Sequence, residues 1–141
     1  NYIPTAVKRS KERARKCKMD FNLDVPYLLD MMEEQEYCCA MSQQRFWHVQ
    51  NVSESSRNPW KASVDRIDTN EGYIKGNVRW VTVAVNLGLN DFEDWIYELT
   101  CVKMHLTLQQ RHPEIKGPAQ MVDMILAKAP NTKPKSIWEE A

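Results

Sequence analysis

Asp65, Asn77 and Asn86 are the residues whose types and spacing carry the most chemical information in this sequence. Carboxylate and amide oxygens suit Mg²⁺ or Mn²⁺ better than zinc as ligands. An ion of this kind can stabilise the charge that develops on a scissile phosphate and on its leaving oxygen. The three residues therefore indicate metal-assisted phosphate chemistry, provided that the fold brings them to one point.

The secondary structure expected around these residues would allow that convergence. Residues 62–68 alternate like a short strand, 69–77 are rich in turn-forming residues, and 78–82 are rich in β-formers. A helix is expected from about Val83. Judged by residue type alone, however, Asp and Asn are more often turn formers than metal ligands.

Two helices and a strand are expected before this segment. Thr5 can cap a helix over residues 5–18, and Asp24 can cap a second helix that has Pro26 in its first turn. Residues 37–47 are predicted to form a strand and a turn.

Helices are expected after it as well. Asp91 is predicted to cap a long helix that ends at His112, and residues 121–129 show a short helical pattern before a Pro- and Lys-rich tail. Five apolar residues are predicted to form the packed face of the long helix: Phe92, Trp95, Ile96, Leu99 and Val102.

The predicted organisation has three parts. Residues 1–36 hold a basic and an acidic helix that pack on the core, residues 37–112 hold the central domain with its long helix, and residues 113–141 are a C-terminal extension. Together they predict an α+β fold.

A balanced total charge conceals an uneven distribution. The chain has 19 basic and 19 acidic residues, yet residues 1–18 hold seven bases and one acid, and residues 20–36 hold acids and no base. A basic arm of this kind favours contact with nucleic-acid phosphates. The expected contacts to DNA are Lys8, Arg9, Arg13 and Arg15 in the arm, with Arg57, Lys61, Lys75 and Arg79 around the site.

The four cysteines, at positions 17, 38, 39 and 101, do not show the paired spacing of a zinc site or a disulfide framework. No structural zinc is expected, and the thiols are predicted to be reduced in a cytoplasmic protein. The sequence contains no apolar run long enough for a membrane span and no signal-peptide pattern.

The central segment also resembles a known family. It reads Ser63-Val64-Asp65-Arg66-Ile67-Asp68, then Gly72-Tyr73, then Gly76-Asn77-Val78-Arg79-Trp80-Val81, and then Asn86. This order is similar to that of the HNH-type proteins found widely in phages, which have an SLDRID-like strand, GY, GN with an RWV-like strand, and an Asn-containing helix. The flanking RARKCKMDFNLD and CAMSQQRF extend the resemblance to roughly residues 5–103.

The resemblance implies a small ββα-metal core and a metal-dependent DNA endonuclease or nickase, similar to homing endonucleases, in a phage-infected or host bacterial cell. Double-stranded DNA would be the substrate and Mg²⁺ or Mn²⁺ the cofactor. By motif match, Asp65 and Asn86 would be the metal ligands, and Asn77 would be the middle Asn, holding a catalytic side chain or a loop backbone by hydrogen bonds.

Two positions depart from the family pattern. Arg66 stands where the family has the His that activates water, and an arginine, which stays protonated, cannot accept that proton. Arg66 can instead hold a phosphate. The candidate bases are then His48, Asp68 and Tyr73, or water on the ion itself. The second departure is Leu89, where family members often have Lys.

These departures keep a second function open. The chain can be a catalytically degenerate member that retains the fold and binds DNA or a protein. A protein partner could dock on the acidic helix or on the C-terminal extension.

Overall fold

The computed structural model describes residues 2–47 and 58–128, and it forms two compact units, Asn1–Glu93 and Asp94–Ala141. The boundary between them lies inside the predicted 37–112 segment. His48 and Arg57 lie outside the described residues. Each unit is considered separately below, beginning with the first.

The first helix, α1, spans Tyr2–Cys17. It therefore begins before Thr5, and the predicted start was wrong because a proline such as Pro4 is tolerated in the first turn of a helix. The buried residues of α1 are Ala6, Ser10 and Ala14, which repeat every four positions. This narrow stripe of small side chains lets the helix backbone approach its neighbours closely, and leaves the charged residues on the remaining faces.

The second helix, α2, spans Val25–Glu34 and confirms the predicted cap. Oδ1 of Asp24 accepts a hydrogen bond from the backbone N–H of Tyr27 at 2.8 Å. This bond satisfies one of the amide groups that a helix N-terminus leaves without an intrahelical partner. Three residues of α2 are buried: Leu28, Met31 and Met32.

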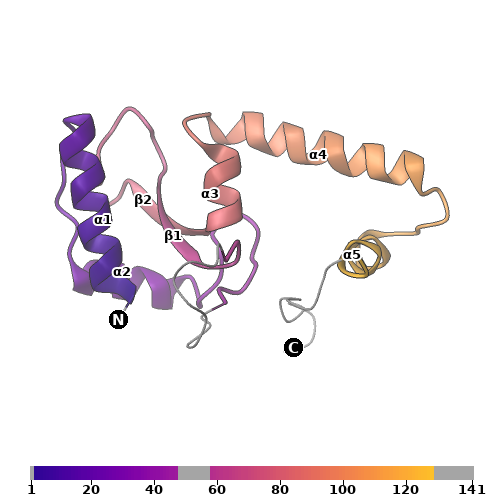
Figure 1. Ribbon diagram of the computed structural model, residues 1–141, viewed down its shortest axis with the longest axis horizontal. Helices are drawn as coiled ribbons and strands as arrows, with labels where there is room; N and C mark the ends of the chain where they lie inside the picture. The colour runs from indigo at the N-terminus through magenta and orange to yellow at the C-terminus, as the bar shows by residue number, and fades with distance from the viewer. Residues whose placement is uncertain (1, 48–57, 129–141) are drawn as a thin grey trace. The chain divides into compact units, whose positions relative to one another are not determined.

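A two-stranded antiparallel hairpin lies between these helices and a third one (Figure 1). Strand β1 spans Ala62–Arg66, strand β2 spans Val78–Thr82, and helix α3 spans Val83–Leu89. All three elements form where the sequence predicted them. The hydroxyl of Thr82 caps α3 by accepting from the Val85 N–H at 3.3 Å.

The register of the hairpin decides which side chains share a face. Val64 is paired with Trp80, and Asp65 with Arg79. Because successive residues of a strand point to opposite faces, Val64 and Trp80 lie on one face and Asp65 and Arg79 on the other. Trp80 contacts α2 and Asn86 of α3 contacts Ser63, so the two helices cover opposite faces.

Trp80 is the centre of the core and is fully buried. Its indole Nε1 donates to the backbone oxygen of Leu28 at 3.0 Å, so its polar atom is satisfied within α2. Gln35, which ends α2, accepts from the Trp80 backbone N–H at 2.9 Å and donates to the Trp80 backbone oxygen at 2.8 Å. Side chain and backbone of one β2 residue therefore fix α2 on the hairpin.

Residues 37–47 form less β-structure than predicted. The segment contains turns and one isolated antiparallel bridge, between Cys38 and Arg45. Its backbone is held by the core instead, since the Ala40 N–H donates to the Trp80 backbone oxygen at 3.0 Å and the sulfur of buried Cys39 accepts from the Thr82 N–H at 3.4 Å. The predicted strand was therefore wrong, whereas the turn was correct.

Gly72 is the point where the β1–β2 loop lies against the link between α1 and α2. A Cβ atom at this position would lie 2.1 Å from the backbone oxygen of Asp20. The same contact is reinforced by hydrogen bonds from the Tyr73 N–H to Asp20 oxygen at 3.0 Å and from the Asn22 N–H to Tyr73 oxygen at 3.2 Å. The GY pair of the motif therefore has a structural role, because only glycine permits this approach.

The second unit contains helix α4, Asp94–Arg111, and helix α5, Pro118–Leu126. The long helix begins three residues after the predicted cap, Asp91. Its predicted packed face was also wrong, because α4 has no buried residue and Trp95, Leu99 and Val102 are exposed, as is Phe92 before it. Helical spacing identified an apolar face correctly, but spacing does not supply the surface that would cover it. No described helix is long and apolar enough to cross a membrane.

Replacing Gly72 with Ala is expected to lower the free energy of unfolding of the first unit by about 3 kcal/mol, since the new Cβ would overlap backbone atoms that cannot move independently. Gly76→Ala is the matched control. Gly76 has open space around it but a φ of +91°, so its replacement should cost about 1–2 kcal/mol through backbone strain alone. Urea unfolding followed by Trp fluorescence measures both, and equal losses would contradict the close approach at Gly72.

Candidate functional site

A cavity of about 350 Å³ opens in the first unit between α1, β1 and α3. Its lining combines four cationic side chains with two carboxylates, those of Asp65 and Asp91. It also contains hydroxyl and amide groups, so it is suited to a charged, polar ligand. The polar and charged residues that line it are Tyr2, Arg9, Arg13, Lys61, Ser63, Asp65, Arg66, Thr69, Tyr73, Asn86, Asn90 and Asp91.

Asp65 is the buried carboxylate among the residues that line this cavity, and only 7% of it is exposed. Its Oδ2 accepts from Nε of Arg79 at 2.9 Å, across the hairpin. The ion pair follows from the register, because residues directly opposite on one face of an antiparallel pair have neighbouring side chains. A buried carboxylate is costly without a partner, and Arg79 supplies one across the hairpin.

Asn86 approaches the same cavity from α3. Its Nδ2 donates to Oγ of Ser63 at 2.7 Å and to the backbone oxygen of Val64 at 3.4 Å. These bonds fix the amide through its nitrogen, and its Oδ1 accepts no hydrogen bond from the described residues. The amide oxygen is therefore the atom of Asn86 that remains for a ligand. Ser63 was not predicted as a site residue, although its place in the motif, two residues before Asp65 on the same strand face, could have identified it.

Arg66 follows Asp65 on β1 and is held by the loop that follows the strand. Its Nη1 donates to the backbone oxygens of Thr69 at 2.8 Å and Glu71 at 3.1 Å, and contacts the sulfur of Met19 at 2.7 Å. Strand alternation explains this direction, since Arg66 must leave the opposite side of β1 from Asp65. Half of the guanidinium is thus engaged in positioning the loop.

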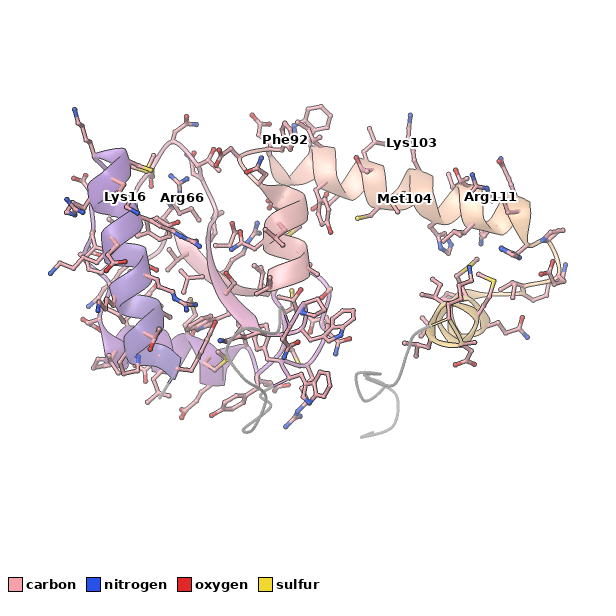
Figure 2. The ribbon with its side chains drawn as sticks, viewed as in Figure 1. Lys16, Arg66, Phe92, Lys103, Met104 and Arg111 are labelled. Atoms are coloured by element: carbon pink, nitrogen blue, oxygen red, sulfur yellow. The ribbon has the colours of Figure 1, made fainter. Side chains whose placement is uncertain are left out.

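The other half of the guanidinium of Arg66 faces the cavity. Its carbon lies 5.3 Å from the centre of the Tyr73 ring, and its Nη2 is 3.7 Å from Oδ1 of Asp91, too far for a hydrogen bond. Asp91 is itself highly exposed. The position is compatible with a contact between Nη2 and a phosphate, as the sequence indicated. In Figure 2 the side chain of Arg66 lies close to the side of α1 that carries Lys16.

Asn77 is buried and fastens the β1–β2 loop. Its Oδ1 accepts from the Asp68 N–H at 2.9 Å, and its Nδ2 donates to the backbone oxygens of Asp68 at 3.0 Å and Gly72 at 2.9 Å. The side chain does not line the cavity. Of the two roles expected for the middle Asn, the structure has the one in which it holds a loop backbone.

The four predicted contacts on α1 divide into two pairs. Arg9 and Arg13 line the cavity, whereas Lys8 and Arg15 are exposed elsewhere on the helix. Arg9 and Arg13 each directly precede a residue of the buried stripe, and lie four residues apart, so they project from one side of the contact surface of α1. The sequence could have distinguished the two pairs, because only Arg9 and Arg13 both directly precede small residues that repeat every four positions along the helix.

Tyr2 is a lining residue that sequence reasoning missed, because it lies before the predicted start of the first helix. Its ring is 6.0 Å from that of Trp80, and Nζ of Lys61 is 4.8 Å from its centre. Burial raises the pKa of Tyr2 to about 12, against the opposing effect of Arg9 and Arg13. Tyr2 is therefore a neutral phenol at physiological pH and supplies no proton-accepting group.

The candidate bases and the remaining predicted contacts lie at different distances from the cavity. Tyr73 is buried and lines it. Asp68 does not line it, and its Oδ1 instead accepts from the Asn70 N–H at 2.9 Å. Lys75, a predicted DNA contact, donates to Oδ2 of Asp24 at 2.6 Å and is likewise outside the lining. His48 and Arg57 belong to the residues that the structure does not describe.

Leu89, where the family often has Lys, is 2% exposed and packs in the core. A lysine at this position of α3 would place a charge among apolar side chains, at a cost that a core leucine avoids. The departure at Leu89 therefore has a packing explanation within this chain.

Comparison with known proteins adds one relative. Over 90 residues the chain is 32% identical to a protein of Enterobacteria phage T4 described as an uncharacterized 29.0 kDa protein in the dda-modA intergenic region. The match covers 64% of this chain and 33% of the phage protein, so the chain corresponds to about a third of that relative. No protein-family model matches the sequence. No solved structure matches it.

Asp65 and Asn86 form a donor set of hard oxygens, which fits Mg²⁺ or Mn²⁺. Within residues 2–47 and 58–128 no group of three or more His, Cys, Asp and Glu residues could hold a metal ion. Mg²⁺ is commonly held by one or two carboxylates and completes its coordination with water and substrate phosphates. An ion held by Asp65 and Asn86 would therefore need water and substrate oxygens to complete its coordination.

Proposed function

We propose that this chain is a metal-dependent DNA endonuclease or nickase with an HNH-type ββα-metal site. The observation that carries the proposal is the cavity that has Asp65 and Asn86 in its lining together with Arg9, Arg13 and Lys61. Oxygen donors for a divalent cation and cations for a phosphodiester backbone are the two requirements of such a reaction, and one cavity offers both. The phage relative is consistent with the proposal but says nothing about activity.

In this proposal each described group has a separate task. Asp65 and Asn86 hold Mg²⁺ or Mn²⁺, which when bound supplies charge stabilisation for the phosphate undergoing hydrolysis. Arg9, Arg13 and Lys61 bind the phosphodiester backbone and position it without reading its sequence. Arg79 keeps the Asp65 carboxylate oriented, and Asn77 keeps the β1–β2 loop closed over the hairpin.

Removing either proposed metal ligand is expected to lower the rate of plasmid nicking by about 10²-fold or more, because several kcal/mol of transition-state stabilisation would be lost. The variants are Asp65→Asn, which keeps the shape that contacts Arg79, and Asn86→Ala. Nicking is measured with Mg²⁺, with Mn²⁺ and with EDTA, and thermal unfolding verifies that each variant is folded. Asp30→Asn, on the exposed side of α2, is the matched carboxylate-to-amide control. Undiminished nicking by Asp65→Asn would exclude the metal site.

The division of the basic arm gives a second test, on binding. Arg9→Gln with Arg13→Gln is expected to weaken binding of duplex DNA and to lower the slope of log K against log salt by about 1.8, since each lost phosphate contact removes about 0.9. Lys8→Gln with Arg15→Gln removes the same charge from the same helix but outside the cavity, and should change the slope much less. Filter binding at salt concentrations between roughly 50 and 200 mM measures this slope for each pair of substitutions. Equal slopes for both double variants would show that the cavity does not receive the backbone.

A second function is supported by a specific observation, the engagement of Arg66 with the loop. The residue that stands in place of the usual base donates to two backbone oxygens, so this position now has a structural role. A catalytically degenerate HNH-fold protein that binds DNA or a protein partner would keep such an arginine. The acidic helix and the C-terminal extension remain proposed sites for a protein partner.

Substitution of Arg66 separates the two functions. If the chain is an active enzyme, Arg66→Ala and Arg66→His should both reduce nicking, because both release the carbonyls of Thr69 and Glu71 and loosen the loop that carries Tyr73. If it is a relic that lost only its base, Arg66→His should gain activity, since general-base assistance is typically worth about 10²–10⁴-fold. The nicking rate of wild type and both variants at fixed Mg²⁺ and DNA decides between them. Inactivity of all three would favour the binding protein.

A further inference from the structure

Both carboxylates in the described lining of the cavity lie beside arginines of the same unit. Asp65 accepts from Nε of Arg79 at 2.9 Å, and both side chains are mostly buried, with 7% of Asp65 and 15% of Arg79 exposed. Oδ1 of Asp91 lies 3.7 Å from Nη2 of Arg66. Each negative charge that could attract a divalent cation is therefore opposed by a positive charge close to it, and opposite charges at such distances largely cancel for a third charge nearby.

The other charges of the cavity are also positive. Arg9, Arg13 and Lys61 line it, and its described lining contains no third carboxylate. Asn86, the second proposed metal ligand, contributes an amide dipole and no charge. In the part of the chain that the structure describes, no three His, Cys, Asp or Glu side chains are grouped so that they could hold an ion. The described residues thus offer oxygen ligands to the ion but little net electrostatic attraction.

A DNA phosphate would supply the missing negative charge. Mg²⁺ sites commonly include substrate phosphate oxygens as ligands. A phosphodiester backbone bound by Arg9, Arg13 and Lys61 would also neutralise cations that repel the ion. The ion in turn would reduce the repulsion between the Asp65 carboxylate and the phosphate. Each ligand then favours the binding of the other, and such a coupling must be equal in both directions.

We propose that the divalent cation and the DNA backbone bind this cavity as a coupled pair, and that Arg79 is a positioning residue that keeps the affinity for the ion low until DNA is bound. Asp65 shares its charge with Arg79, so the guanidinium opposes the ion at the one buried carboxylate of the described lining. The inference rests on the proposed function, because it concerns the same ion and the same DNA. It adds the order in which the cavity is filled.

Titration of the full chain with Mn²⁺ in the absence of DNA tests the role of Arg79, with the electron paramagnetic resonance signal of free Mn²⁺ as the readout. Arg79→Gln retains a hydrogen-bond donor for Asp65 but removes the charge, so it is expected to tighten Mn²⁺ binding about tenfold or more. Arg79→Lys retains the charge and should bind Mn²⁺ as weakly as wild type. Lys75→Gln is the matched control, because it removes a positive charge that lies outside the lining and should leave the affinity unchanged.

Fluorescence anisotropy of a labelled DNA duplex tests the coupling itself. The affinity is measured with and without Mn²⁺ at constant ionic strength, before nicking becomes detectable on a gel. Mn²⁺ is expected to tighten binding of the duplex by wild type about five- to 150-fold, the usual range for coupled sites. Asp65→Asn lacks the carboxylate and should show no tightening, which controls for Mn²⁺ bound by the duplex alone. This comparison needs no substitution at Arg79, and thermal unfolding verifies that each variant is folded.

The outcomes that contradict the inference differ in what they leave intact. Tight binding of Mn²⁺ by wild type without DNA, unchanged by the duplex, would overturn the coupling but retain the metal site of the proposed function. Mn²⁺ binding no stronger than that of Asp65→Asn, with or without the duplex, would overturn both. Equal Mn²⁺ affinities for Arg79→Gln and Arg79→Lys would show that the charge of Arg79 does not set the affinity for the ion, and would overturn the role assigned to this residue.

Discussion

A hairpin of two strands is at best marginally stable in water, and the first unit is arranged to overcome that limit. Both faces of β1 and β2 need cover, and helices on opposite sides provide it. Trp80 is the residue on which this cover converges, since its side chain is satisfied by α2 and its backbone by Gln35. Loss of the fit around Trp80 would expose the hairpin and, with it, every residue that lines the cavity.

The same constraint explains why the candidate site lies where it does. One face of β1 must be apolar to meet the core, so Val64 points toward α1 and α2. Strand alternation then places Ser63 and Asp65 on the face that meets α3. Asn86 reaches the cavity from α3 because its amide is bonded to that strand. The polar residues of the site are thus gathered at an edge of the hairpin by the requirement that its other residues be buried.

Sequence reasoning located the hairpin and α2 well because each has a local signal: alternation in β1, β-forming residues in β2, and the capping residue Asp24 before α2. It could not foresee that Arg66 would be held by Thr69 and Glu71, because those bonds depend on the course of a loop that no local pattern specifies. Nor could apolar spacing along α4 reveal whether a surface covers it. The motif identified Asp65, Asn77 and Asn86 together, but only the hydrogen bonds separate Asn77, which fastens a loop, from the two residues that line the cavity.

The hydrogen bonds of Gln35 also affect how readily the protein can aggregate. A strand at the edge of a sheet exposes N–H and C=O groups that can pair with an edge strand of another molecule, which is a common route to aggregation. The carboxamide of Gln35 occupies both backbone groups of Trp80, and Ala40 adds a second donor to the same oxygen. One side chain thereby closes the middle of the outer edge of β2 to strand addition. This small sheet is protected from edge-to-edge association without the charged or proline residues that larger sheets use for that purpose.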